Sequence, residues 1–233
     1  MEISVVELSV VIPSMNESKN LDFVLPRLNS ALTTTGLDYE ILIVDTVAPD
    51  SATQEVCKKN AATYLNRAPN NSYGSANRTG IKAAQGHHIL IMDADGSHEP
   101  EFIHKLLAHQ DEYDIVIASR YAKGGASRAT TKAIVMSRML NATYGTIFGL
   151  NYSDLSNSFK LYKAEVLKNL NLTCENFDII QEILVKARRN NPKLKILEVP
   201  YIFQERVTGK SKRETPKFIL TYLQTLCKLL LGG

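Results

Sequence analysis

The chain has 233 residues, of which 44% are hydrophobic and 22% are charged, and its formal net charge is +3. This length can bury a sizeable core without disulfides or a structural metal. A net charge of +3 is too small to indicate nucleic acid, so we expect no nucleic-acid partner. The three cysteines lie far apart and form neither a disulfide framework nor a metal-binding spacing, which favours reduced thiols in the cytoplasm.

The first half of the chain alternates short apolar runs with helical patterns. Residues 8–12 predict a buried strand that ends at Pro13, and a helix follows that is capped by Ser18 and kinked or restarted at Pro26. The same patterns then predict strands at 40–44, 63–65, 88–92 and 115–118, and helices at 51–62, 75–84 and 100–109. This alternation is typical of an α/β fold with a parallel sheet and right-handed crossovers.

Polar or charged side chains follow four of the predicted strands. They are Asn16 and Glu17, then Asp45, then Asp93 and Asp95, and finally Arg120. In open α/β sheets, ligands bind at the carboxyl ends of the strands. The sequence therefore predicts a ligand site that these side chains share.

Charge is distributed unevenly around the third of these positions. Residues 93–114 contain seven acids and one lysine, whereas residues 120–153 contain five basic residues and no acid. This order is typical of a metal-binding region followed by an anion-binding region. Solvated helix faces are the alternative interpretation.

Asp93 and Asp95 leave a buried strand two residues apart, so their side chains can point to the same side. Carboxylate oxygens are suitable ligands for Mg²⁺ or Mn²⁺. Two carboxylates leave coordination positions for a substrate diphosphate, which favours a metal–diphosphate site. The alternative is a turn that only caps the next helix.

The C-terminal residues 218–231 contain a single lysine in fourteen positions and are too short to span a bilayer. A packed helix and a membrane-associating helix at the interface both remain open. Residues 133–150 form a second apolar stretch, which is either an acceptor-binding surface or core. We expect one domain over residues 1–233, with residues 214–233 as the apolar C-terminal helix.

Six segments together resemble glycosyltransferase family 2, the inverting enzymes of the GT-A fold, and within it the dolichol- and polyprenyl-phosphate sugar synthases. They are VVIPSMNE at 10–17, EILIVD at 40–45, IMDADGSHEP at 91–100, DIVIASRYAKGG at 114–125, SDLSNSFKLYK at 153–163 and EVPYIFQERVTGKSK at 198–212. The resemblance covers residues 8–215. It implies a Rossmann-like, mostly parallel sheet flanked by helices.

The resemblance also implies an activity. The enzyme would transfer mannose or glucose from a nucleoside-diphosphate sugar, GDP-mannose or UDP-glucose, to a dolichyl or polyprenyl phosphate, with Mg²⁺ or Mn²⁺ as cofactor. It would act as a peripheral protein on the cytoplasmic face of a membrane. A family 2 enzyme with a soluble glycan or protein acceptor, and a nucleotide-sugar-binding protein without catalysis, are the alternatives.

Carried over position by position, the resemblance implies three groups of site residues. The donor site consists of Pro13, Asn16 and Glu17 near the nucleotide, Asp45 at its base, Asp93 and Asp95 at the metal, and Arg206, Ser211 and Lys212 at the phosphates. The acceptor phosphate would meet Arg120 and Ser137, with Lys132 nearby. Asp95, Arg120, Arg206 and Lys212 would carry catalysis.

Both groups of basic residues have alternatives. Arg120 could form a strand-end salt bridge instead, and the region around Arg206 and Lys212 could be a solvated basic loop. Gly209, between Thr208 and Lys210, predicts a lid that orders when the donor binds.

The chain also departs from the family pattern at several positions. They are Thr46 in place of a second acid, Ser51 in place of a usual glycine, Gly96 where leucine or an equivalent is usual, Ala133 in place of a basic residue, and Ser158 and Lys160 in place of glycine and arginine. These departures affect the identity of the donor and the register of the acceptor more than the class of reaction.

Overall fold

A computed structural model describes residues 5–208 and 215–232, and in the second range the side chains from residue 220 onward. The strands are β1 (Leu8–Pro13), β2 (Tyr39–Asp45), β3 (Thr63–Asn66), β4 (His88–Ile91), β5 (Ile115–Ser119), β6 (Ala126–Ser127), β7 (Lys160–Lys163), β8 (Ile196–Pro200) and β9 (Ile202–Phe203). The helices are α1 (Ser18–Thr33), α2 (Ser51–Lys59), α3 (Tyr73–Ala83), the short 3₁₀ helix η1 (Pro100–Phe102), α4 (Ile103–Leu107), α5 (Thr131–Phe148), α6 (Ala164–Lys168), α7 (Ile179–Asn190) and α8 (Thr215–Leu230).

Seven strands form the central sheet, in the order β3-β2-β1-β4-β7-β5-β8, and β6 pairs with β9 in a small second sheet. All strands of the central sheet run parallel except β7, which is antiparallel to both β4 and β5. The expected mostly parallel α/β fold is confirmed. The chain moves outward from β1 to β2 in one direction and reaches β4 on the other side, so a topological switch point lies between β1 and β4.

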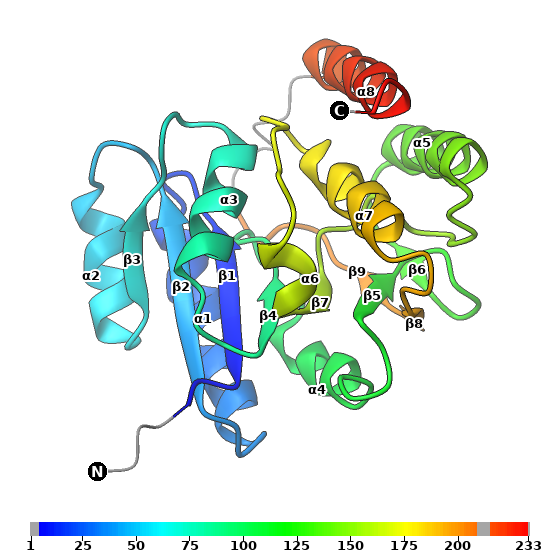
Figure 1. The fold of residues 1–233 in the computed structure, drawn as a ribbon. Helices are drawn as coiled ribbons and strands as arrows, with labels where there is room; N and C mark the ends of the chain where they lie inside the picture. Colours follow the sequence, from blue (N-terminus) through cyan, green and yellow to red (C-terminus); the bar gives the residue numbers. More distant parts are fainter. Residues whose placement is uncertain (1–4, 209–214, 233) are drawn as a thin grey trace.

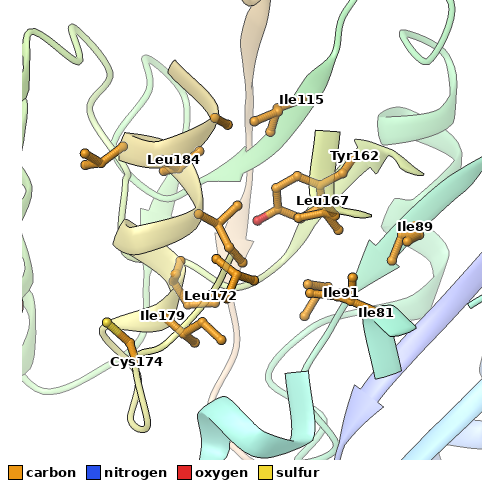
Figure 2. Packing of buried hydrophobic residues seen from close by; sticks show 14 of the residues in the cluster. Ile81, Ile89, Ile91, Ile115, Tyr162, Leu167, Leu172, Cys174, Ile179 and Leu184 are labelled. Atoms are coloured by element: carbon orange, nitrogen blue, oxygen red, sulfur yellow. The ribbon is translucent and has the colours of Figure 1, made fainter. Parts of the chain in front are cut away.

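Hydrophobic layers cover both faces of this sheet, because successive side chains of a strand point to opposite faces. On one face Val10 and Ile12 pack with α1, α2, η1 and α4. On the other face Val11 packs with α3, α5, α6, α7 and α8. Figure 1 shows α3, α6 and α7 on the near face of the sheet, and Figure 2 shows side chains of α7, such as Ile179 and Leu184, beside strand residues such as Ile115.

The predicted elements of the first half all form, with shifted ends. Helix α1 continues through Pro26 and does not restart there, because Leu21, Val24 and Leu28 on its inner side are fully buried against the sheet. Ser18 is its first residue and not its cap; Glu17 holds the cap position without a side-chain hydrogen bond. The antiparallel strand β7 was not among the strands that the sequence predicted.

Candidate active site

A cleft of about 760 Å³ opens at the carboxyl ends of β1 and β4, beside the switch point. Six of the predicted site residues line it: Pro13, Glu17, Asp93, Asp95, Arg120 and Arg206. They come from positions as far apart as the end of β1 and the segment after β9. Three of the four predicted strand ends therefore contribute side chains to one cleft, whereas Asn16 and Asp45 do not line it.

Asp93 is held by hydroxyl groups from two other parts of the chain. The Tyr73 Oη and the Ser158 Oγ each donate to its Oδ1 at 3.0 Å. Burial raises the pKa of Asp93 and the charge of Asp95 adds to this effect, whereas the two hydrogen bonds oppose it. The carboxylate thus has a fixed orientation at the edge of the cleft.

Asp95 is held by its own turn and by the segment after β9. Its Oδ1 accepts from the Ser97 backbone N at 3.0 Å and from the Ser97 Oγ at 2.6 Å. Its Oδ2 lies 3.2 Å from Nη2 of Arg206, and the Val207 backbone N donates to the Asp95 carbonyl at 2.9 Å. These contacts hold Arg206 and Val207 against Asp95.

The arrangement around Asp95 explains why residue 96 is a glycine. Its φ is +80°, and a Cβ at this position would lie 2.5 Å from the Cγ2 of Val207. A larger residue would be strained by the backbone conformation and would push Val207 away. The departure from the family pattern at this position permits the close approach of residues 206–208.

The two carboxylates fit a hard divalent cation. Each has its Oδ1 held by hydroxyl or backbone donors, so each would offer its Oδ2 as an oxygen ligand; the Oδ2 of Asp95 contacts Arg206 in this structure. Within residues 5–208 and 215–232, no group of three or more His, Cys, Asp or Glu side chains could hold a metal. A cation held here would need further oxygen ligands from a diphosphate or from water.

His98 supports the carboxylate pair from the protein interior. Its Nδ1 accepts from the Asp93 backbone N at 3.0 Å, so its proton is on Nε2, which lies 3.1 Å from the Oδ1 of Asn157. Burial lowers the pKa of His98, and its ring stacks on Phe159. His98 is therefore a neutral residue that positions Asp93.

Arg120 forms the strand-end salt bridge that the sequence left open as an alternative. Its Nε and Nη2 both donate to the carboxylate of Asp154 at 2.7 Å, and Nη2 also reaches the Ser156 Oγ at 2.8 Å. Burial alone would raise the pKa of Asp154, but the charge and hydrogen bonds of Arg120 hold it below its ordinary value. Arg120 still lines the cleft, and its Nη1 forms no hydrogen bond with the residues that the structure describes.

The other two predicted acceptor residues do not line the cleft. Ser137 is buried in α5, where its Oγ pairs with the Tyr121 Oη at 2.6 Å and lies 3.4 Å from the Ser156 Oγ. Lys132 is exposed in the first turn of α5. Ser137 thus belongs to the wall behind Arg120, and Lys132 lies outside that wall.

Asp45 and Asn16 contact each other, and neither lines the cleft. Asn16 has a φ of +54°, and its backbone N donates to the Asp45 Oδ1 at 2.9 Å. Asp45 is fully buried, and its Oδ2 has no hydrogen-bond partner among the described residues. An unpaired buried carboxylate oxygen is costly unless a ligand supplies a donor.

Comparison with known proteins agrees with this geometry. Residues 9–170 match the family model described as Glycosyl transferase family 2. The chain belongs to this family. It is 34% identical over 236 aligned residues to a dolichol-phosphate mannosyltransferase of Pyrococcus furiosus, covering 96% of this chain and 64% of the relative. It is 30% identical to an undecaprenyl-phosphate mannosyltransferase of Micrococcus luteus, covering 87% of this chain and 85% of the relative.

Solved structures show the same fold at lower identity. A glucosyl-3-phosphoglycerate synthase from Mycobacterium tuberculosis, in complex with Mn²⁺, uridine diphosphate and phosphoglyceric acid, matches with a TM-score of 0.72 and 18% identity. The match covers 96% of this chain and 77% of that chain. The GT-A fold expected from the sequence is thereby confirmed for this family 2 chain.

Sequence reasoning missed several residues of the family 2 site. Arg67 is buried in the cleft wall and donates to the backbone carbonyls of Val44, Asp45, Asn71 and Ser72. The other missed lining residues are Ser14, Met15, Asn70, Asn71, Ser72, Tyr73, Ala94, Ser156, Asn157, Ser158, Glu175, Asn176, Phe177, Ile180 and Phe203. The Pro-Asn-Asn-Ser run after β3 was the available signal, because turn residues at a strand end often form binding loops.

Ser211 and Lys212 lie outside the described residues, as do Gly209 and Lys210 of the predicted lid. Their assignments therefore stay predictions. The described side of that segment is anchored, since the Thr208 Oγ1 donates to the Asn20 Oδ1 at 2.7 Å.

Proposed function

We propose that this chain is an inverting glycosyltransferase that transfers a hexose from a nucleoside-diphosphate sugar to a polyprenyl or dolichyl phosphate. The observation that carries the proposal is the cleft itself, which Asp93 and Asp95 line together with two arginines, Arg206 and Arg120. A divalent cation and two cationic side chains suit a reaction between two phosphate-bearing substrates. The names of the Pyrococcus and Micrococcus relatives favour mannose as the sugar and a lipid phosphate as the acceptor.

The donor side of the proposal assigns the diphosphate to the carboxylate pair. Asp93 and Asp95 would hold Mg²⁺ or Mn²⁺, which when bound neutralises charge on the departing diphosphate. Arg206 already lies beside this position, and with Ser211 and Lys212 it would bind the phosphate oxygens. The unpaired Oδ2 of Asp45 would accept an N–H of the base, which requires a local opening of the chain because Asp45 is fully buried. Both guanine and uracil carry such an N–H.

The acceptor side of the proposal relies on Arg120. A lipid monophosphate is already anionic at neutral pH, so it can attack without a dedicated strong base. Asp154 fixes the guanidinium of Arg120 and leaves Nη1 to face a phosphate in the cleft. The role of Arg120 is therefore alignment of the attacking oxygen.

A membrane surface is the proposed source of the acceptor. Within the part of the chain that the structure describes, no helix is sufficiently long and apolar to cross a bilayer. Helices α5 and α8 lie near each other in Figure 1, and the Tyr144 Oη of α5 donates to the Tyr222 carbonyl of α8. Their exposed side chains include the apolar residues Val135, Met139, Ile147, Leu220, Leu223 and Leu230 and the basic residues Lys132, Arg138 and Lys228. Such a surface suits peripheral binding to anionic lipid, and we place it at the cytoplasmic face.

The test is transfer of radiolabelled sugar from GDP-mannose and from UDP-glucose to polyprenyl phosphate in vesicles with Mn²⁺. We expect labelled product in the organic phase with one of the two donors, and no product with Asp95→Asn. Label that appears only on a water-soluble acceptor would replace the lipid with a soluble acceptor, such as the phosphoglyceric acid in the complex of the Mycobacterium tuberculosis synthase. Binding of both donors without any transfer would indicate a non-catalytic protein.

A further inference from the structure

The two hydroxyl groups on Asp93 come from distant parts of the chain and reach the same oxygen. Tyr73 is the first residue of α3, and Ser158 lies two residues before β7. Both donate to Oδ1 at 3.0 Å, and Oδ2 accepts no hydrogen bond from the described residues. A carboxylate oxygen has two lone pairs, so the two donors saturate Oδ1.

Both donors are themselves held in place. The ring of Tyr73 stacks on Phe177 with centroids 4.4 Å apart. Ser158 is buried, and its neighbour Asn157 donates to the Ala118 carbonyl at 2.6 Å. The Nζ of Lys160 donates to the Asn157 carbonyl. Asp93 therefore cannot rotate to offer both oxygens without breaking this support.

The hydrogen bonds from Tyr73 and Ser158 to Asp93 affect which divalent cation this carboxylate can bind. Ca²⁺ takes six to eight oxygen ligands in a flexible shell and often binds carboxylates through both oxygens, whereas Mg²⁺ requires a strict octahedron with single-oxygen contacts. Asp95 shows the same feature, because its Oδ1 is held by Ser97. In each carboxylate one oxygen is fixed by hydrogen bonds and the other is the one that would meet a cation, in Asp95 after Arg206 moves to the diphosphate. Two single-oxygen contacts suit a small octahedral cation.

We propose that Tyr73 and Ser158 are positioning residues that restrict Asp93 to single-oxygen coordination and thereby make the site prefer Mn²⁺ or Mg²⁺ over Ca²⁺. This inference rests on the proposed function, because it takes the carboxylate pair as the metal site. It adds two residues that neither the sequence nor the family resemblance assigned. One of them, Ser158, is a position where the chain departs from the family pattern.

The experiment measures metal affinity and does not depend on turnover. Mn²⁺ binding is titrated by electron paramagnetic resonance in the presence of GDP and, separately, UDP, with Ca²⁺ as competitor. The variants are Tyr73→Phe, Ser158→Ala and the double variant; Tyr73→Phe keeps the ring that stacks on Phe177. Tyr64→Phe is the matched control, since the Tyr64 Oη accepts from the Asp50 backbone N at 3.0 Å and Tyr64 does not line the cleft.

For the double variant we expect Mn²⁺ affinity to fall by about tenfold to a hundredfold, the usual range for residues that orient a metal ligand. Ca²⁺ affinity should fall less, so that the preference for Mn²⁺ over Ca²⁺ narrows by about tenfold. The control should match wild type. An unchanged preference with intact wild-type Mn²⁺ binding overturns this inference alone. Wild-type protein that binds no Mn²⁺ with either nucleotide, or an Asp95→Asn variant that binds it normally, overturns the proposed function as well.

Discussion

The cleft contains two arginine–carboxylate pairs that differ in almost every physical respect. Arg120 and Asp154 form a buried pair, in which the arginine side chain is 11% exposed and the aspartate is fully buried, with two short hydrogen bonds between the side chains. Arg206 reaches Asp95 at 3.2 Å and Glu17 at 3.5 Å, with all three side chains partly exposed. The Arg120–Asp154 pair is part of the framework, the set of buried contacts that hold the fold together. In the function that we propose, the second pair joins groups that exchange partners when a cation and a diphosphate bind.

The difference follows from the cost of burying charge. A buried charge that loses its partner is strongly destabilising, because no water replaces the lost interaction. A partly exposed pair contributes less to stability, so its members can change partners to bind a ligand at a smaller cost in free energy. A basic residue in a cleft therefore does not indicate by itself whether its role lies in folding or in binding.

The prediction with the largest expected effect tests the exchangeable pair, Arg206 and Asp95. Asp95→Asn should reduce sugar transfer by about a thousandfold, because a bound metal supplies several kcal/mol of charge stabilisation. The fold should persist, since the asparagine can still accept from Ser97. Transfer assays and urea unfolding of the same preparation check this expectation. Full activity of the variant, or activity that survives excess EDTA, would remove the metal assignment.

The second prediction tests the framework pair. Arg120→Ala leaves Asp154 buried without a partner, so the free energy of unfolding should fall by about 3–5 kcal/mol in addition to any loss of transfer. Urea denaturation measures this change. Arg27→Ala is the matched control, because Arg27 forms the same two-bond contact with Glu101 on the surface, and it should cost less than about 1 kcal/mol. Equal losses in the two variants would contradict the distinction between framework and exchangeable pairs.

The third prediction concerns Arg206. Arg206→Ala should change the free energy of unfolding by less than about 1 kcal/mol. In the presence of Mn²⁺, its affinity for GDP or UDP should fall by about tenfold to a hundredfold, the loss of one charge-assisted hydrogen bond. Titration calorimetry of nucleotide binding to Arg206→Ala and to the control Arg27→Ala compares the two affinities. Wild-type affinity in Arg206→Ala would favour the alternative of a solvated basic loop.

The fourth prediction concerns Lys160, a buried residue of β7. Burial lowers the pKa of Lys160 from its ordinary value of 10.5 to about 7. Between about pH 7 and 10 the unfolded chain therefore binds more protons than the folded one, so stability rises with pH in this window. Lys160→Met lacks this contribution. Relative to the variant, wild type should gain up to about 1.4 kcal/mol per pH unit.

Urea denaturation of both proteins from about pH 6 to about pH 9.5 checks this expectation. Below about pH 7, where Lys160 is protonated in both states, the difference between the two proteins should be constant. Parallel curves across the whole range would show that Lys160 keeps its charge in the folded protein.

The sequence by itself predicted the fold class, the strands of the first half and the position that we propose for the metal. Continuous apolar runs such as residues 88–92 can only be buried strands or buried helix, and the turn signals around them decide in favour of strands. Because parallel strands end at one edge of a sheet, Asp93 and Asp95 could be placed beside Glu17 from local pattern alone.

Only the tertiary structure decided which charged groups pair with one another. Arg120 meets Asp154 across 34 positions of sequence, and Ser158 meets Asp93 across 65. These contacts depend on the antiparallel insertion of β7 between β4 and β5, and the buried lysine within β7 concealed that strand from any apolar pattern. The hydrophobic periodicity of a segment shows which of its side chains are buried. The partner of a buried charge depends on how distant segments pack together, and local periodicity carries no information about that packing.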